Sequence, residues 1–469
     1  MTNNQLEEKI IGLVQCYKST STSLFESDTD NRDFFLFLLF WCLHESNQAT
    51  TNGKSLNIIS AKDFISDLEI LASEHDDASA IKQAIDAALP KLGMLDKRKL
   101  PSFLKKSFSD VEGLLLKNER NSITSDECVT IYRRVMYRLI QMNAIDHLAK
   151  NIDYEEIPPD FIELVDGLVS TGSHKTNSAY FPYEITGEQS VYFASKNPDC
   201  AITIESPFYS PHLMRMLALV GASNVNLSFS SPIHKDANVQ KETFDLSCTL
   251  LQPTKVNEKR EEGKKFEPIK GDFSPERLIS DSVPRMYKEH AYLQHTLWSL
   301  NERGHSYFFI GKGPLFREGE KLARKILVDK NAVDTVVMLP SNLMTFNALP
   351  LFLLVLSKTK QASNVLYVDA TQDFYSDSKR NRLTNINKII DIMCHRKIIN
   401  GISVEVGNDE IIERDYSLNP QDYFDEPKLV NDNALSLEKN RRTLITSLEI
   451  KQKNINKMFK LLSKNNSQN

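Results

Sequence analysis

The sequence predicts an α/β protein in which an all-helical N-terminal domain precedes a Rossmann-like, doubly wound sheet domain and a C-terminal helical or coiled-coil tail. Apolar residues recur at three- and four-residue spacing through the first third of the chain, which is typical of helices. Beyond that part, short apolar runs alternate with amphipathic segments, which indicates parallel βαβ units. Near the end, leucines fall at heptad spacing. We therefore expect domains at 1–155, 156–428 and 429–469.

The N-terminal helices are expected where a polar residue that can cap a helix precedes a periodic apolar run, as at Asn31 and Ser125. The most apolar run, FFLFLLFWCL at 34–43, is about half the roughly 20 residues that a membrane span needs. Charged residues flank it, so we interpret it as a core helix. The beginning of the chain, TNNQLEEK, is polar and acidic, and we expect no signal peptide.

The sheet is expected from short apolar runs bounded by turn residues. YFFIG and TVVML are apolar throughout, as strands buried on both faces should be. Between the runs lie segments with a helical period, at 212–222, 285–304 and 318–331. The expected strands are 199–206, 223–231, 244–251, 306–313, 332–340, 349–358 and 363–370.

The tail carries a heptad seam that two charged residues, Arg441 and Lys451, interrupt. This pattern predicts a coiled coil or a helix that binds a partner, and a helix packed on its own protein is an equal alternative. The seam consists of Leu437, Leu444, Leu448, Ile455, Met458 and Leu462.

Composition narrows the classes of function. Hydrophobic content of 41% and charged content of 25% are those of an ordinary soluble globular protein. The net charge of -5 argues against a protein coated in nucleic acid and leaves room for a local basic face. The six cysteines and ten histidines show no paired spacing. We therefore expect no metal site, no membrane partner and a reducing, cytoplasmic location.

An ordered set of short motifs fills residues 292–424. No single motif is specific, but their order is. The motifs are Gly313-Pro314-Leu315-Phe316, Leu339-Pro340-Ser341-Asn342-Leu343, Leu349-Pro350, Asp369-Ala370, Asn381-Arg382-Leu383 and Asp415-Tyr416-Ser417-Leu418-Asn419. This ordered set resembles the C-terminal half of the catalytic domain of N6-adenine DNA methyltransferases, specifically the modification subunits of type I restriction-modification systems.

The resemblance implies an architecture and a set of partners. It implies a methyltransferase-like α/β domain after a helical N-terminal domain. The tail occupies the place where family members carry a helix that packs on the DNA-specificity subunit. The implied partners are DNA and either a specificity-type subunit or an active paralogous methyltransferase, in a hetero-oligomer. Active members of the family use S-adenosylmethionine.

The family binds this cofactor with a strand that runs into an Asp/Glu-Pro-x-x-Gly-x-Gly turn. The glycines let the backbone approach the cofactor, and an acid at the end of the next strand holds the ribose hydroxyls. The resemblance places the turn after 201–204, with Glu205, Pro207 and Phe208 as vestigial cofactor positions. Side chains then stand where the glycines are required, and the following strand ends without an acid.

A Gly-x-Phe/Tyr-x-Thr-Pro stretch helps to bind the cofactor in the family. Its counterpart here is 177–182, in which Tyr180 and Pro182 remain, whereas the glycine and the threonine are absent. We therefore predict that no cofactor is bound, and that S-adenosylmethionine is the cofactor if the chain is active.

The catalytic turn of the family is Asn-Pro-Pro-aromatic, which accepts hydrogen bonds from the amine of a flipped adenine and stacks on its ring. Here Gln252 offers a displaced oxygen, and Lys255 offers no aromatic face and adds a positive charge. Three lost interactions of 1–3 kcal/mol would remove roughly four orders of magnitude in rate. A plain strand-to-loop turn is the alternative. The turn reads Gln252-Pro253-Thr254-Lys255.

A basic cluster in DSKRNRL, formed by Lys379, Arg380 and Arg382, is a candidate DNA-phosphate contact. A solvated run of charges is an equal alternative. We predict a catalytically inactive modification-type subunit that binds DNA and partners in a restriction or phage-defence complex. An active N6-adenine methyltransferase that uses Gln252, and a DNA-contacting scaffold without a small-molecule site, are the alternatives.

Overall fold

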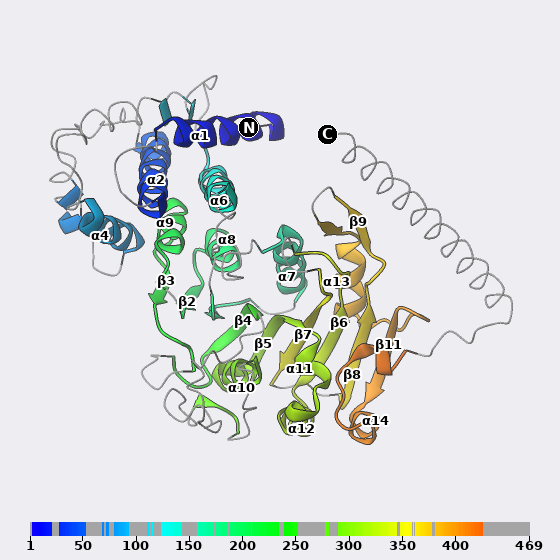
Figure 1. Ribbon diagram of the computed structural model, residues 1–469. Coiled ribbons are helices and arrows are strands. Elements are labelled where there is room, and N and C mark those ends of the chain that lie inside the picture. The colour runs from blue at the N-terminus through cyan, green and yellow to red at the C-terminus, as the bar shows by residue number, and fades with distance from the viewer. Residues whose placement is uncertain are drawn as a thin grey trace, which may run out of the picture. The chain divides into compact units, whose positions relative to one another are not determined.

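The computed structural model describes most of the chain as far as residue 424 (Figure 1). Residues 1–420 group into one compact unit and residues 421–469 into a second. The domain boundaries expected at 155 and 428 stay predictions, and the heptad tail lies outside the described residues. The described residues are 2–20, 28–52, 68–69, 72–74, 79–92, 110–111, 114–115, 123–142, 157–172, 175–184, 187–207, 209–233, 239–251, 277–280, 289–344, 348–358, 360, 362–377 and 380–424.

The N-terminal part is helical, as expected. Every residue of the apolar run 34–43 is buried, so this run is a core helix. Both expected caps differ from the structure. Asn31 lies inside a helix that begins at Asp28. Thr124, and not Ser125, exchanges hydrogen bonds with Glu127 in a capping box. No helix in the described ranges is long and apolar enough to cross a membrane. The helices are α1 (Asn3–Thr20), α2 (Asp28–Asn52), α4 (Ala80–Leu92) and α6 (Ser125–Met142).

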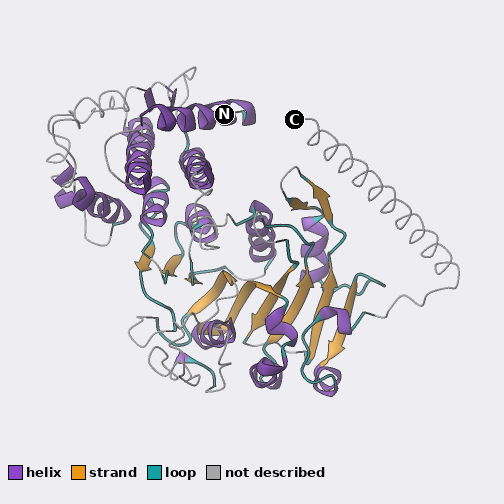
Figure 2. Cartoon of the chain, in the orientation of Figure 1, coloured by secondary structure: helices purple, strands orange, loops and turns teal. Residues whose placement is uncertain are grey.

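The second part is a mixed sheet with helices on both sides (Figure 2). The strands are β1 (Ser178–Pro182), β2 (Ala201–Glu205), β3 (Val225–Ser228), β4 (Phe244–Leu251), β5 (Leu300–Gly311), β6 (Val333–Met338), β7 (Leu351–Ser357), β8 (Asn364–Asp369) and β11 (Ser403–Gly407). Their order across the sheet is β11-β8-β6-β7-β5-β4-β1-β2-β3. A separate hairpin pairs β9 (Phe374–Ser376) with β10 (Asn381–Leu383).

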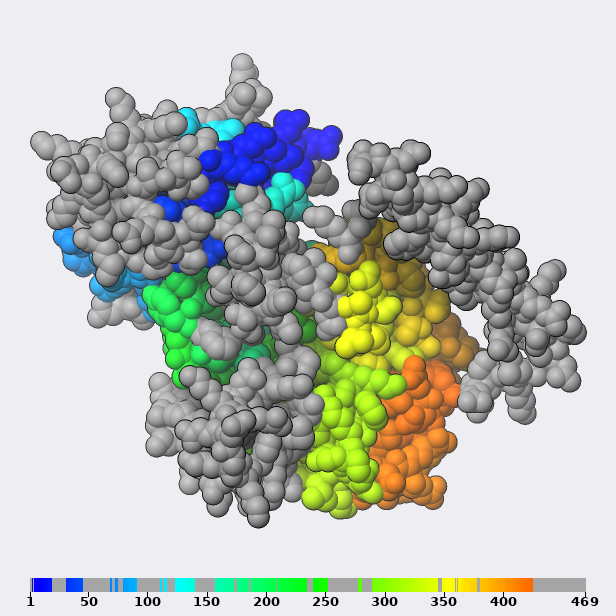
Figure 3. All heavy atoms as spheres, viewed as in Figure 1, coloured from blue at the N-terminus to red at the C-terminus, as the bar shows by residue number. Residues whose placement is uncertain are grey.

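The helices of this part alternate with the strands along the chain. Figure 1 shows α7, α8 and α13 on one side of the sheet, and α10, α12 and α14 on the other. The segment from β5 to α14, coloured yellow-green to orange in Figure 3, forms one continuous surface. The helices are α7 (Pro159–Thr171), α8 (Glu188–Lys196), α9 (Pro211–Leu219), α10 (Glu289–Ser299), α11 (Gly313–Phe316), η3 (Glu318–Glu320), α12 (Lys321–Asp329), α13 (Ile386–Cys394), α14 (Asn408–Glu413) and η4 (Pro420–Asp422).

Two expectations about the sheet are corrected. The expected sheet was parallel, but β7 runs antiparallel to both β5 and β6, and β11 runs antiparallel to β8. The direction of a strand is set by its pairing and leaves no mark on its apolar pattern. A strand was also missed: β1 lies between β4 and β2. It has five residues and ends in a proline, so it carries little strand signal of its own.

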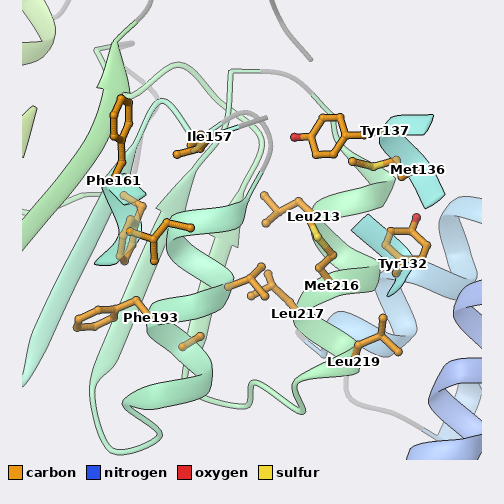
Figure 4. Packing of buried hydrophobic residues seen from close by; sticks show 14 of the residues in the cluster. Tyr132, Met136, Tyr137, Ile157, Phe161, Phe193, Leu213, Met216, Leu217 and Leu219 are labelled. Carbon is orange, nitrogen blue, oxygen red and sulfur yellow. The ribbon is translucent and has the colours of Figure 1, made fainter. Parts of the chain in front are cut away.

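Helix α9 joins the N-terminal helices to the sheet. Its cap is Ser210, whose hydroxyl accepts a hydrogen bond from the backbone N–H of Leu213. Figure 4 shows Leu213, Met216 and Leu217 between the side chains of α6 and Phe193 of α8. All are buried in one hydrophobic cluster that extends from α1 to α13. This shared core accounts for the grouping of residues 1–420 into one unit.

Candidate functional site

The strand order reverses between β1 and β4, which are parallel neighbours in the middle of the sheet. In open α/β sheets, ligands bind outside the carboxyl ends of the strands at such a switch point. Strand β1 ends there at Pro182 and β4 at Leu251. The predicted catalytic turn comes next in the sequence after Leu251. Its residues Gln252, Pro253, Thr254 and Lys255 lie outside the described residues.

The cofactor turn predicted after 201–204 follows β2 and not the strand at the switch point, and its position stays a prediction. Strand β1 lies at the switch point, and β2 (Ala201–Glu205) is its neighbour on the side away from β4. The motif Asp/Glu-Pro-x-x-Gly-x-Gly then falls without a gap on the sequence FPYEITG at 181–187. This alignment keeps Pro182 and the final glycine, but places Phe181 at the acid and Ile185 at the first glycine. Pro207 follows the second strand, and Phe208 lies outside the described residues.

Gly187 keeps the backbone conformation that the turn requires. Its φ is 86°, a left-handed value that favours glycine. A Cβ atom there would lie 2.5 Å from Cδ1 of Leu213, so the position is also closely packed. The carboxylate of Glu184 accepts hydrogen bonds from the backbone N–H groups of Gly187, at 2.9 Å, and Ser190, at 3.4 Å. A resident acid therefore satisfies the amides at the beginning of α8.

Glu205, at the carboxyl end of β2, stands where the family places its ribose-binding acid. Its side chain is buried, and its Oε2 is hydrogen-bonded to the hydroxyl of Tyr180 on β1. The Tyr180 hydroxyl lies 2.9 Å from Nε2 of His295 on α10. Burial raises the pKa of Glu205, although the charge of Arg277 opposes that rise. Tyr180 is therefore an internal partner of the acid.

Helix α10 covers this end of the sheet with aromatic side chains. The rings of Tyr183, which follows β1, and Tyr292 lie 4.7 Å apart between centroids. Both residues are buried. Burial raises the pKa of Tyr292, whose hydroxyl is hydrogen-bonded to Ser231, beyond the end of β3. Tyr292 of α10 is thus held between the residue that follows β1 and the segment that follows β3.

These residues do not fit S-adenosylmethionine. The turn lacks its acid and its first glycine, the acid of β2 is bound to Tyr180, and Tyr292 of α10 packs on Tyr183. No chemical step is therefore derived through this cofactor. In the described ranges, no group of three His, Cys, Asp or Glu residues could hold a metal ion.

The basic cluster is only partly described. Lys379 lies outside the described residues, and Arg380 precedes β10. Arg382 forms a bidentate ion pair with Asp160 at the beginning of α7, with Nη2 2.7 Å from Oδ1. The guanidinium group of Arg382 therefore has an internal partner, which the sequence did not indicate.

A buried charged cluster beyond β5 was also missed. Nη1 of Arg317 lies 2.8 Å from the carboxylate of Glu320 and 3.6 Å from that of Glu289. His290 contributes Nε2, which lies 3.1 Å from the carbonyl oxygen of Pro314. Arg324, which is almost fully buried, donates to the carbonyl oxygens of Tyr416 and Arg317.

The motifs that carry the family resemblance contact one another in pairs. The N–H of Leu418, in the last motif, donates to the carbonyl of Leu315, in the first. The N–H of Asn381 donates to the carbonyl of Asn342. Their order in the sequence therefore reflects packing of the fold.

A cleft of about 620 Å³ lies at the opposite edge of the sheet, near the amino ends of β4 and β6. It is lined in part by Asp245 and Asp334. Asp245 accepts hydrogen bonds from the N–H of Asn177 and the amide of Asn301, and Asp334 pairs with Arg396. The carboxylates of this cleft are therefore already bound by the protein's own donors, and we assign no chemistry to it.

Comparison with known proteins confirms the resemblance. Residues 252–432 match the family model N-6 DNA Methylase. The type I restriction enzyme MpnII methylase subunit of Mycoplasma pneumoniae is 34% identical over 140 residues, which cover 29% of this chain and 26% of that protein. The MjaVII methylase subunit of Methanocaldococcus jannaschii is 32% identical over 119 residues, which cover 24% and 21%. The match thus spans about a quarter of the length of these curated relatives.

The likeness of fold extends further than the likeness of sequence. The type I restriction-modification system methyltransferase subunit from Streptococcus thermophilus superposes with a TM-score of 0.66 at 17% identity. The superposition covers 91% of this chain and 100% of that one. It confirms the predicted fold class, including the helical N-terminal part.

Proposed function

We propose that this chain is a methylase-type subunit of a type I restriction-modification or related phage-defence complex, and that it binds DNA and partner subunits without transferring a methyl group. The supporting observation is an asymmetry. The motifs that pack the fold are kept, whereas the residues that would serve the chemistry are replaced. At the switch point, Phe181 and Ile185 stand in place of an acid and a glycine, and Glu205 is engaged by Tyr180.

The catalytic turn supports the same proposal. Gln252 carries one methylene more than the asparagine of the family, which displaces its amide oxygen from a flipped adenine. Thr254 replaces a proline, and Lys255 replaces the aromatic residue that stacks on the base. A positive charge beside a cationic sulfonium is unfavourable in a site that excludes water. The replaced residues of the cofactor turn and those of the catalytic turn therefore both argue against methyl transfer.

The proposed partners are DNA and either a specificity-type subunit or an active paralogous methyltransferase, in a cytoplasmic hetero-oligomer. The N-terminal helices and the tail 429–469 are the proposed contact regions. Co-expression with the products of the flanking genes, followed by size-exclusion chromatography, tests this part. Removal of residues 429–469 should release the chain from the complex, whereas an unchanged elution volume would show that the tail is not required.

Methyl transfer is tested by incubating the protein with plasmid DNA and S-adenosylmethionine labelled in the methyl group. We expect no label in N6-methyladenine for the wild type or for Gln252→Ala. The second candidate function, an active N6-adenine methyltransferase, draws on the retained Gln252, Pro253 and Gly187. It predicts labelling by the wild type that Gln252→Ala abolishes.

DNA binding is tested by titrating a fluorescent duplex at low and high salt, because phosphate contacts weaken steeply as salt rises. Lys379→Gln and Arg380→Gln are the informative variants, since Arg382→Gln would also break the ion pair with Asp160. We expect weaker binding by the double variant. Binding without salt dependence would exclude this cluster as the DNA contact and, with it, the scaffold alternative.

A further inference from the structure

A continuous hydrogen-bonded chain crosses the interface between α10 and the sheet. It consists of the carboxyl group of Glu205, the hydroxyl of Tyr180, the ring of His295 and the carbonyl of Arg277, and we call it the Glu205 chain. Nδ1 of His295 lies 3.1 Å from the carbonyl oxygen of Arg277. The three side chains are at most 1% exposed. This chain joins β1, β2, α10 and the segment 277–280.

The positions of the hydrogens in the Glu205 chain follow from the carbonyl oxygen of Arg277, which is the acceptor at one end. A carbonyl oxygen can only accept, so Nδ1 of His295 carries a hydrogen. Burial and the charge of Arg277 lower the pKa of His295 to about 3, so the ring is neutral and its Nε2 must accept. The Tyr180 hydroxyl therefore donates its single hydrogen to Nε2. The hydrogen in the bond between Tyr180 and Glu205 must then come from Glu205.

The surroundings of Glu205 agree with this assignment. Its Oε1 is buried and has no hydrogen-bond partner in the described part of the chain. An ionised carboxylate with an unsatisfied buried oxygen costs several kcal/mol, and protonation removes most of that cost. The charged or titratable groups that face it are Tyr180, His295, Tyr292 and Arg277. Among them only Arg277 favours ionisation by its charge, and burial outweighs it.

We propose that Glu205 is an uncharged carboxylic acid that fastens α10 to β1 and β2, and that this internal bond replaces the contact to a cofactor ribose. In the family the corresponding acid faces ribose hydroxyls in an open crevice. Here the acid donates to Tyr180, and Tyr292 of α10 packs against Tyr183, which follows β1. The proposal rests on the proposed function, because it explains how a fold built around a cofactor closes without one.

Infrared difference spectroscopy of the full-length protein at pH 7 tests the protonation state directly. The wild type minus Glu205→Gln should show the carbonyl stretch of one protonated carboxyl group. Glu205→Gln is suitable because its amide N–H can donate to Tyr180 and keep the chain intact. Tyr180→Phe should shift this band to higher frequency, because the acid loses its acceptor. A difference spectrum that contains carboxylate bands and no carboxyl band would overturn the proposal.

Thermal unfolding tests the fastening of α10. Tyr180→Phe should lower Tm by several degrees, because it interrupts the chain at its centre. Tyr307→Phe is the matched control, since the Tyr307 hydroxyl has no hydrogen bond among the described residues. Equal Tm values for the two variants would contradict the fastening. Methyl transfer to plasmid DNA would overturn the proposed function, whereas a missing carboxyl band would overturn the Glu205 chain alone.

Discussion

The guanidinium group of Arg382 lies against the carboxylate of Asp160, which is 222 positions away in the sequence. Nε and Nη2 both donate to the carboxylate, and the N–H of Leu383 adds a third hydrogen bond at 3.1 Å. Asp160 is buried at the beginning of α7, and Arg382 lies in β10. The pair therefore fixes the β9–β10 hairpin to the helix that packs on α13.

Removing one partner of this pair should destabilise the protein strongly. Asp160→Ala leaves the Arg382 charge and the Leu383 amide without an acceptor, which we expect to cost about 3 kcal/mol in the free energy of unfolding. Denaturation in urea measures it. The control is Asp329→Ala, which removes the exposed ion pair with Lys325 and should cost less than about 1 kcal/mol. Similar losses for the two variants would show that the Asp160 pair is solvated.

Alanine substitutions at Gly187 and Gly221 distinguish the energetic cost of backbone strain from the cost of a packing clash. Both have a positive φ, at 86° and 66°, so an alanine at either position is strained by about 1 kcal/mol. Only at Gly187 does the added Cβ also meet a side chain, Leu213. We expect Gly187→Ala to be at least 1 kcal/mol more destabilising than Gly221→Ala. Equal costs in chemical denaturation would mean that Leu213 moves aside freely.

Low pH should decrease the free energy of unfolding because His290 becomes protonated. Burial lowers the pKa of His290 from 6.5 to about 4, so the folded protein takes up its proton later than the unfolded chain does. The stability contributed by the neutral ring is present above pH 6.5 and is lost as the pH falls through about 4. At pH 5 the loss from this ring should be about 2 kcal/mol.

The measurement is the free energy of unfolding of the wild type and His290→Gln at pH 7 and pH 5. His295 titrates in the same direction, since its pKa is lowered to about 3, so the wild type and the variant share that background. The variant should lose less stability on acidification than the wild type. An identical loss would exclude His290 as a contributor.

Arg324 should hold the last family motif in place. Its Nε donates to the carbonyl of Tyr416 at 2.8 Å, and its Nη1 donates to that of Arg317 at 2.7 Å. Arg324→Met fills the space but removes both donors, so the segment 415–419 should open more often. Hydrogen exchange of the Leu418 amide, which is bonded to Leu315, should accelerate at least tenfold. Unchanged protection would mean that the contact between Leu315 and Leu418 is sufficient.

The sequence revealed the part of the fold that depends on local pattern and on motif order. The strands β5 to β8 are buried and apolar, so their pattern predicts strands. Their motifs keep a recognisable order because residues such as Asn342 and Asn381 are in contact in the fold. Strand β1 could not be read, because it is short and its position depends on pairing with β2 and β4.

Part of the candidate site could be predicted from the sequence, because it also depends on a local pattern. Glu205 was singled out as an acid at a strand end, which is a local signal. Its partner Tyr180 lies 25 positions away, and His295, which Tyr180 also contacts, is separated from Tyr180 by 115 positions. No pattern within one sequence joins such distant residues. The antiparallel direction of β7 could not be predicted from the sequence either, because it depends on pairing with residues that are distant in the sequence.

The most direct test of the central claim is isothermal titration of the intact protein with S-adenosylmethionine. Glu205 is hydrogen-bonded to Tyr180, and the turn after β1 lacks the acid and the first glycine of the family motif. We expect only the heat of dilution, for the wild type and for Glu205→Gln alike. A saturable one-site isotherm for the wild type that Glu205→Gln abolishes would contradict the account.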